Sequence, residues 1–255
     1  MIFRAVTEND LPQLKAIWLS CFEEEEQAVE LFFKRNLSFT HGYAAEQNGA
    51  LIAAVYLVDC TLCGEQAHYL CGAATLPDFR RQGVMSGLIR CALADAQSRG
   101  DRFSTLLPAS DGLYRYYETL GYRTAGTVYR ESLLTAPGEI TPGKPDFQRL
   151  QQDCFQDKFL LWNNNYFDFA REYYACYGVQ CVESKHAFAL YEPNGDVFYA
   201  VYYSLNELKA LLFQKGLRRV TLWRNSGGHP VRQGMILPLS DALTPDEFYI
   251  GLSLQ

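Results

Sequence analysis

The sequence predicts an α/β protein with a mixed, mostly antiparallel central sheet flanked by helices, followed by a second, smaller domain. Strand-like apolar runs alternate with stretches of helical period over residues 1–134. Residues 135–145 hold three prolines and two glycines, which predicts a linker between domains. Residues 192–202 then repeat residues 46–56 without gaps, with identity at six of eleven positions. We therefore expect a second domain at 146–255 that is a diverged copy of the first, the alternative being chance likeness between two Asn-Gly hairpins.

Local signals predict the elements of the first domain in chain order. Thr7 and Asp10 have the spacing of a capping box, so a short strand at Ile2–Val6 is expected to lead into a helix. Asn48-Gly49 tolerates the positive φ angles of a tight turn and predicts a hairpin. The further expected elements are a helix at about 24–36, strands at 43–46, 50–59 and 68–76, a helix at 84–99, a strand at 103–107, a helix at 112–120 and a strand at 122–131.

Composition excludes several classes of protein. The chain has 255 residues, of which 48% are hydrophobic, so it can fill a core. A net charge of −6 argues against a dedicated nucleic-acid binder. The longest uncharged apolar run, Leu51–Val58, is less than half of the ~20 residues that a membrane span needs. The first ten residues turn polar too early for a signal peptide, so we expect a cytoplasmic protein without a membrane partner.

The eight cysteines predict neither a disulfide scaffold nor a metal site. Their spacing is irregular, and no second pair accompanies Cys60 and Cys63 at the spacing of a zinc site. That pair also lies in a strand-like run rather than at the start of a helix, where a redox motif would lie. We expect buried or half-buried free thiols and no metal.

The stretch from Leu76 to Ile89 indicates an anion site. A strand ends at Leu76 and a helix begins near Val84, and the amino end of a helix offers unpaired N–H groups and partial positive charge. Gly83 allows a ligand to approach the backbone, and Arg80 and Arg81 add positive charge. A pyrophosphate would fit this loop, although such loops also occur as plain turns.

Two motifs resemble those of the GNAT superfamily of acetyl-CoA-dependent N-acetyltransferases. Arg80-x-x-Gly83, with Pro77 three residues before it, resembles the family's phosphate motif, and Tyr117-x-x-x-Gly121-Tyr122 resembles the signature at the end of the last core helix. The order of expected elements agrees over roughly residues 1–130. Met85 departs from the usual Gly or Ala. The form Arg-Arg-x-Gly-Val-Met is similar to acetyltransferases of the enhanced-intracellular-survival type, which carry a second GNAT-like unit.

The resemblance implies a GNAT-like sheet and acetyl-CoA as the cosubstrate. It places the phosphates on a loop made of Arg80, Arg81, Gln82, Gly83, Val84, Met85 and Ser86. It also implies that backbone groups of Ala74, Thr75 and Leu76 hold the pantetheine arm and the acyl carbonyl, where the strand at 68–76 splays from the strand at 103–107 and leaves groups without ladder partners. The small residues Gly72, Ala73 and Ala74 would leave room for the arm; the alternative is close packing against a helix.

Tyr117 is our candidate for the general acid, because a phenol with a pKa of about 10 is protonated at neutral pH and can donate to a departing thiolate. The general base is open between His68, which is more often a packed strand residue, the terminal carboxylate of Gln255, which the resemblance suggests, and water. No cysteine lies in the motifs, and Cys71, the nearest, is interpreted as structural. We therefore expect direct attack by the amine.

The acceptor is expected to be a small-molecule or peptide amine. The acidic run 23–26 lies between the first two helices, where the family shapes its acceptor pocket, and it would attract a cation; more often such a run is a solvated face. Polyamine, aminoglycoside, amino acid and protein amino group all stay open, as does the oligomeric state. The second domain, without a phosphate loop of its own, is expected to wall the acceptor pocket. The rival functions are a non-catalytic acyl-CoA sensor and a protein–protein adaptor.

Overall fold

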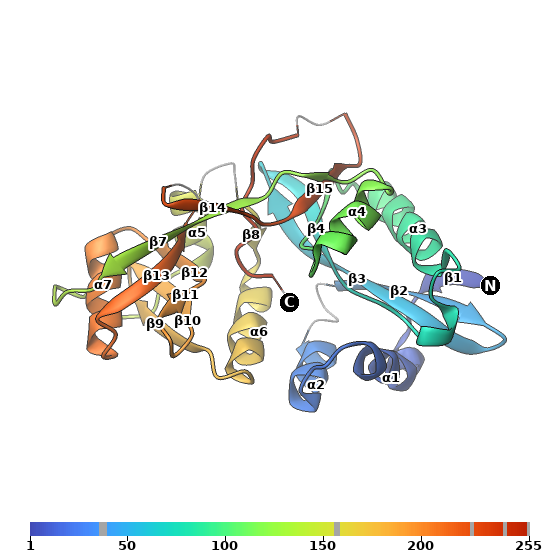
Figure 1. Ribbon diagram of the computed structural model, residues 1–255, viewed down its shortest axis with the longest axis horizontal. Coiled ribbons are helices and arrows are strands. Elements are labelled where there is room, and N and C mark those ends of the chain that lie inside the picture. The colour runs from blue at the N-terminus through green and yellow to red at the C-terminus, as the bar shows by residue number, and fades with distance from the viewer. Residues whose placement is uncertain (36–39, 156–158, 225–226, 242–243, 254–255) are drawn as a thin grey trace. The chain divides into compact units, whose positions relative to one another are not determined.

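The computed structural model describes residues 1–35, 40–155, 159–224, 227–241 and 244–253 (Figure 1). The chain divides into two compact units. The first consists of Met1–Arg123 together with Met235–Thr244, and the second of Thr124–Gly234 together with Pro245–Ser253. Each unit has its own sheet structure and hydrophobic core.

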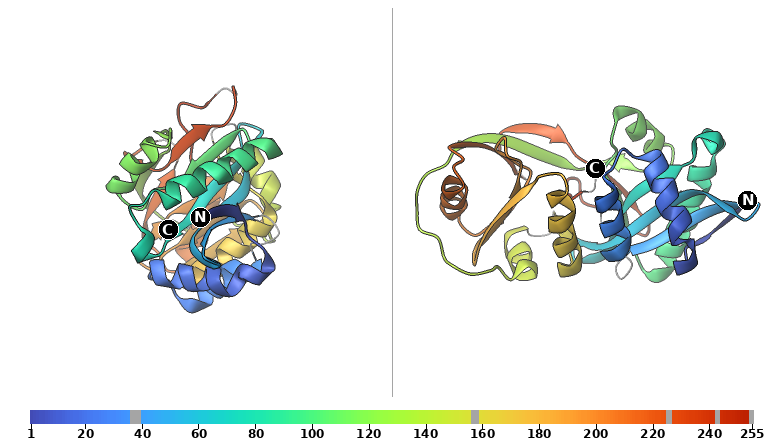
Figure 2. Two further views of the ribbon diagram at one scale, coloured as in Figure 1. Left: turned by 90° about the vertical axis from the view of Figure 1, so that its right-hand side faces the viewer. Right: turned by 90° about the horizontal axis from the view of Figure 1, so that it is seen from below.

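The first unit is built on one sheet with the order β1-β2-β3-β4-β5-β15. Neighbouring strands are antiparallel except for the parallel pair β4 and β5. The helices α1 and α2 lie on one face of the sheet, and α3 and α4 lie on the other (Figures 1 and 2). The bounds are β1 Ile2–Ala5, α1 Leu11–Cys21, α2 Glu26–Arg35, β2 Thr40–Gln47, β3 Ala50–Leu62, β4 Glu65–Thr75, α3 Val84–Arg99, β5 Phe103–Leu106, α4 Asp111–Glu118 and β15 Met235–Pro238.

Local signals in the sequence act as predicted in this unit. Asn48 and Gly49 both have positive φ, at 54° and 80°, and form the turn between β2 and β3. The Thr7 amide donates to the Asp10 carboxylate over 2.7 Å, which completes the capping box before α1. Two short 3₁₀ turns, Glu8–Asp10 and Pro77–Phe79, precede α1 and the phosphate loop. The predicted mostly antiparallel sheet flanked by helices is confirmed.

A β-bulge interrupts the pairing of β3 with β4. Ala54 faces Ala74, but Tyr56 faces Cys71, so β4 has one residue more than its partner at this point. Gly72, with φ +58°, takes up the kink. On the other side, the pairing of β4 with β5 stops at Tyr69 and Thr105. The carboxyl half of β4 is therefore bent and has no partner in β5, which is the predicted splay.

The second unit contains two small sheets and three described helices. One sheet has the order β12-β10-β9 and the other β11-β13-β7-β14. The bounds are β7 Thr127–Leu134, α5 Phe147–Phe155, β8 Leu161–Trp162, α6 Asn164–Ala175, β9 Gln180–Ser184, β10 Ala187–Tyr191, β11 Asp196–Val197, β12 Tyr199–Tyr202, α7 Leu205–Gln214, β13 Arg219–Arg224 and β14 His229–Arg232. The repeated residues 192–202 turn the chain from β10 into β12, which pair antiparallel, as 46–56 turn it from β2 into β3. The duplication itself stays a prediction.

The domain boundary differs from the predicted one. Residues 127–134 belong to the second unit, because β7 pairs with β13 and β14. The segment 135–145 does not link the units but runs along the second, where the Thr135 amide donates to the Arg218 carbonyl over 3.1 Å. The chain also returns to the first unit with β15, which pairs with β5. The strand expected at 122–131 is split into β6 (Arg123–Thr124) and β7.

Candidate active site

The loop between β4 and α3 presents a run of free main-chain amides. Within the described residues, the amides of residues 81–86 have no hydrogen-bond partner, and Gly87 is the first to find one, donating to the Gly83 carbonyl over 3.0 Å. Arg81 and Gly83 have positive φ, at 60° and 78°, so successive N–H groups turn toward one concave side. They lie at the amino end of α3, where the helix dipole favours an anion. The loop therefore has the donors that a pyrophosphate needs.

Side chains of the loop hold its shape. The Arg80 Nε donates to the Thr75 carbonyl over 2.9 Å, and the Gln82 side-chain amide donates to the Asp78 carbonyl over 2.9 Å. Arg80 and Arg81 are both exposed to a solvent cavity beside the loop. A Cβ added to Gly83 would meet no atom within 4 Å, so no protein atom fills the space beside this glycine. The loop thus combines a fixed backbone with positive charge at its rim.

A cavity of about 390 Å³ leads from this loop along β4, and we call it the donor cavity. Of the backbone residues predicted to hold the pantetheine arm, Ala74 and Thr75 line it. Leu76 does not, and its amide donates to the Ile52 carbonyl over 2.9 Å. The full lining is Cys21, Phe22, Ala73, Ala74, Thr75, Phe79, Arg80, Arg81, Gly83, Val84, Met85, Ser86, Leu113, Tyr116 and Tyr117.

Two different constraints account for the small residues near the carboxyl end of β4. A Cβ on Gly72 would lie 2.5 Å from the Trp18 ring, so this glycine is required by close packing against α1, which was the alternative interpretation. Ala73 and Ala74 instead line the donor cavity, where their small side chains leave room beside the strand. The bulge at Gly72 therefore lies at the inner end of the donor cavity.

A second cavity, of about 160 Å³, continues past the bulge, and we call it the inner cavity. It shares Phe22, Ala73, Leu113 and Tyr117 with the donor cavity. Its other lining residues are Trp18, Glu24, Tyr69, Leu70, Cys71, Gly72, Leu106, Leu107, Pro108 and Ala109. Of the acidic run 23–26, Glu24 alone belongs to this lining, and the other three glutamates are exposed.

Tyr117 lies where the two cavities meet. It comes from α4 and is 7% exposed, and its hydroxyl has no hydrogen-bond partner among the residues that the structure describes. Burial, followed by the neighbouring Tyr116 and Cys71, raises the pKa of Tyr117 above the ordinary value of a phenol. Its hydroxyl therefore stays protonated at neutral pH and can donate a proton to a group in either cavity.

The cysteines are all free thiols, as predicted. Burial and then the nearby Glu24 charge raise the pKa of Cys71, so its thiol is neutral and a poor nucleophile although it lines the inner cavity. No group of three or more acidic, histidine or cysteine side chains among the described residues could hold a metal ion. No described helix is long and apolar enough to cross a membrane.

His68 lies away from both cavities. It is fully buried, and its two ring nitrogens contact Asp101 over 2.6 Å and Ser104 over 2.7 Å. This geometry favours the packed strand residue that the sequence analysis gave as the alternative. The other candidate base, the terminal carboxylate of Gln255, lies outside the described residues.

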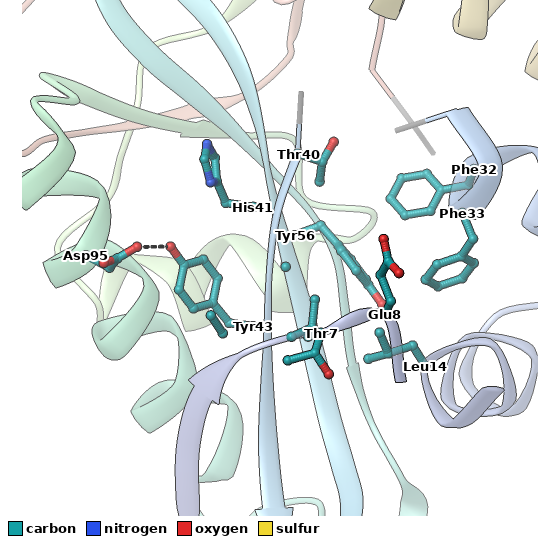
Figure 3. Close-up of a pocket in the computed structure, with 13 residues that line it drawn as sticks. Thr7, Glu8, Leu14, Phe32, Phe33, Thr40, His41, Tyr43, Tyr56 and Asp95 are labelled. Carbon is teal, nitrogen blue, oxygen red and sulfur yellow. Dashed lines mark hydrogen bonds between the residues drawn. The ribbon is translucent and has the colours of Figure 1, made fainter. Parts of the chain in front are cut away.

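A third cavity, of about 390 Å³, surrounds Tyr56 between α1, α2 and the start of β2 (Figure 3). Figure 3 shows Glu8 beside Tyr56, on the side where Phe32 and Phe33 lie, and Asp95 hydrogen-bonded to Tyr43 on the other side. Neither Tyr117 nor the phosphate loop contributes to its lining. The phosphate loop and Tyr117 therefore belong to the donor and inner cavities and not to this one.

Comparison with known proteins finds a family model that matches the first part of the chain. Residues 3–125 match the family model described as an acetyltransferase (GNAT) domain. The phosphate loop and Tyr117 both fall inside the matched segment, and the chain carries a GNAT acetyltransferase domain over these residues. A comparison with curated protein sequences gave no match.

Solved structures extend the likeness over most of the chain. A conserved protein from Enterococcus faecalis V583 has a TM-score of 0.74 at 15% identity, with 93% of this chain and 72% of that one covered. Eis1 from Mycobacterium abscessus has a TM-score of 0.67 at 14% identity, with coverage of 93% and 73%. A GCN5-related N-acetyltransferase from Kribbella flavida has a TM-score of 0.64 at 19% identity, with coverage of 92% and 70%. These likenesses concern the fold alone, and they take in both units.

Proposed function

We propose that the protein is an N-acetyltransferase that moves an acetyl group from acetyl-CoA to an amine by direct attack, with Tyr117 as the general acid. The GNAT acetyltransferase domain at residues 3–125 supports acetyl-CoA as the donor. The observation that carries the proposal is the place of Tyr117. Tyr117 lines both the cavity that begins at the amide loop and the cavity beside it, and its protonated hydroxyl has no hydrogen-bond partner among the described residues.

Residues of this chain could bind both the pyrophosphate end and the thioester end of acetyl-CoA. The amides of residues 81–86 would bind the pyrophosphate, with Arg80 and Arg81 adding charge at the rim. The pantetheine arm would lie along Ala73, Ala74 and Thr75, where β4 has left β5. In this arrangement the thioester end reaches the bulge at Gly72, next to Tyr117.

The proton steps follow from this geometry. Acetyl-CoA supplies an acetyl group activated as a thioester. As the amine nitrogen bonds to the carbonyl carbon and the carbon–sulfur bond breaks, the Tyr117 hydroxyl gives its proton to the leaving sulfur. The proton that the nitrogen loses restores the phenol, so no proton is gained or lost overall. The raised pKa of the Cys71 thiol supports direct attack over an acetyl-cysteine intermediate.

The test distinguishes an enzyme from an acyl-CoA sensor. A sensor would bind acetyl-CoA at the amide loop but would not catalyse acetyl transfer. Acetyl-CoA binding is measured by calorimetry, and CoA release is measured with a panel of amines. Binding with amine-dependent release is expected. Binding without release for any amine would favour the sensor, and failure of CoA to raise the melting temperature would favour an adaptor that holds no ligand.

A further inference from the structure

We infer that Tyr116 is a positioning residue, which connects the loop that would bind the diphosphate of the donor to the general acid, Tyr117. The remote end of acetyl-CoA would then help to place the general acid, and a donor without the diphosphate would react more slowly even at saturation. The inference rests on the proposed function and concerns the same site. Its basis is the hydrogen bond between the Tyr116 hydroxyl and Ser86 Oγ, which are 3.1 Å apart.

The direction of the Tyr117 hydroxyl depends on the packing of its ring. The hydroxyl has no hydrogen-bond partner among the described residues, so no polar contact holds it in place. Among aromatic side chains, the ring contacts Tyr116 at a centroid distance of 5.1 Å and Tyr122 at 5.7 Å. A general acid must lie within hydrogen-bond reach of the atom that it protonates. These two neighbours therefore help to decide whether Tyr117 can reach the leaving sulfur.

The two neighbours are anchored in different parts of the molecule. Tyr122 is buried, and its hydroxyl contacts Ser104 Oγ over 2.6 Å inside the core. Tyr116 is half-buried in the wall of the donor cavity, and its hydroxyl is bonded to Ser86, the third residue of α3. Of the two rings that contact Tyr117, the Tyr116 ring is therefore the one that a bound donor can influence.

Ser86 belongs both to the diphosphate site and to the contact with Tyr116. Its amide is one of the free amides of residues 81–86, and its side chain reaches the Tyr116 hydroxyl. An anion bound to these amides would fix the first turn of α3, and the Ser86 side chain with it. Ser86, Tyr116 and Tyr117 all line the donor cavity, so a bound arm would also exclude water that competes for the Ser86–Tyr116 hydrogen bond. Donor binding and placement of the general acid are thus connected through one hydrogen bond.

This connection predicts an effect on kcat rather than on KM alone. Binding energy from a remote part of a substrate raises kcat when it is used to orient groups at the reacting centre. A donor that keeps the thioester arm but lacks the diphosphate leaves the first turn of α3 without its anion. Tyr116 is then held less firmly, and Tyr117 is in the productive position for a smaller fraction of the time.

The test compares acetyl-CoA with S-acetylpantetheine, which has the same thioester arm without the diphosphate and the nucleotide. Thiol release is measured at saturating donor, with the amine that reacts fastest in the panel. In the parent protein, kcat should be about 10-fold lower with S-acetylpantetheine than with acetyl-CoA. Tyr116→Phe keeps the ring and removes the hydrogen bond, so kcat with acetyl-CoA should fall about 10-fold while kcat with S-acetylpantetheine stays nearly the same.

Two results of this comparison would overturn the inference. Equal kcat values for the two donors in the parent protein would show that the diphosphate has no influence on the chemical step. A fall of kcat by the same factor for both donors in Tyr116→Phe would show a general structural defect instead of a lost connection. Melting temperatures of both proteins, measured with and without CoA, show whether each folds and binds the donor.

The other partner of the hydrogen bond provides a second measurement. Ser86→Ala should lower kcat with acetyl-CoA by the same factor as Tyr116→Phe, and the double variant should be no slower than either single variant. Ser98→Ala removes a hydroxyl from the far end of α3, where it is bonded to the Ala94 carbonyl, and Tyr114→Phe removes one from α4. Both controls should keep the kcat of the parent protein. Additive losses in the double variant would contradict the inference.

A third measurement asks whether Tyr116 acts through Tyr117. In a Tyr117→Phe background the general acid is absent, so adding Tyr116→Phe should lower kcat no further. A further fall of about 10-fold would overturn the inference while leaving the proposed function intact. Full activity of Tyr117→Phe, or acetyl-CoA binding without turnover of any amine, would overturn the proposed function and the inference together.

Discussion

The Nδ1 atom of His68 lies 2.6 Å from a carboxylate oxygen of Asp101, and both side chains are buried. The Nε2 atom contacts Ser104 Oγ over 2.7 Å, which contacts the Tyr122 hydroxyl over 2.6 Å. Serine, histidine and aspartate stand here in the order of a hydrolase triad, yet none of them lines a described cavity. We interpret the group as a hydrogen-bond network that joins β4 to β5 inside the core.

This network predicts a loss of stability in mild acid. Burial, opposed by the hydrogen bond to Asp101, lowers the pKa of His68 below its ordinary value of about 6.5. The unfolded chain therefore takes up a proton near pH 6.5 that the folded protein resists. The stabilisation that depends on neutral His68 is fully present above about pH 6.5. As the pH falls toward the pKa of His68 in the folded protein, the free energy of unfolding decreases by up to about 1.4 kcal/mol per pH unit.

Urea unfolding at pH 7.5, 6.5 and 5.5 measures this slope. His68→Gln removes the titrating group, so its free energy of unfolding should be lower at pH 7.5 and should vary less with pH in this range. His229→Gln, at an exposed histidine, provides the matched control and should keep the slope of the parent protein. A parent protein whose stability does not change between pH 7.5 and 5.5 would refute the prediction.

Tyr117→Phe tests the general acid. The variant keeps the ring that packs against Tyr116 and Tyr122 and removes the proton donor at the junction of the cavities. We expect kcat to fall roughly 10- to 10³-fold while the affinity for acetyl-CoA stays nearly the same. Tyr114→Phe removes a hydroxyl from the same helix at a residue that lines neither cavity, so kcat should stay near that of the parent. Full activity of Tyr117→Phe would exclude the assigned role.

Gly83→Ala tests whether the loop amides bind the diphosphate. Gly83 and Gly100 are at the two ends of α3, both have positive φ, and an added Cβ would meet no protein atom at either. Both alanine variants should therefore lose similar stability, about 1–2 kcal/mol. Only Gly83→Ala adds a methyl group within the loop of free amides, so calorimetry should show CoA binding weakened at least about 10-fold there and little changed in Gly100→Ala. Equal affinities would contradict the binding mode.

Much of the first unit could be predicted because its signals are local. The Asn48-Gly49 turn and the capping box of Thr7 and Asp10 each depend on residues a few positions apart. The phosphate loop is also local, since a strand end, a glycine and a helix start suffice to define it. The unit boundary is different: β7 and β15 are assigned by their partners β13, β14 and β5, roughly 90 to 130 residues away. The prolines and glycines after β7 predict a linker between the domains, but in the structure the chain continues along the second unit there.

The sequence predicted the parts of the site that a sequence motif or the local backbone defines. It did not predict the parts that depend on how side chains pack. Tyr117 and Gly83 stand in recognisable patterns. Trp18, Phe22 and Leu113 line the inner cavity, but in the sequence they look like ordinary core residues of helical period. The bulge could not be foreseen either, because it depends on the register of β3 against β4.

The course of residues 135–145 yields a final prediction. In the second unit the buried Glu207 carboxylate accepts the Thr141 amide over 2.9 Å and the Ser184 hydroxyl over 2.7 Å. Glu207→Ala leaves both donors unpaired, at about 1–3 kcal/mol each. Hydrogen exchange at Thr141 should therefore accelerate about 10-fold or more, whereas Glu207→Gln, which keeps an acceptor oxygen, should accelerate it less. If the Thr141 amide already exchanges freely in the parent protein, the segment is a flexible linker after all.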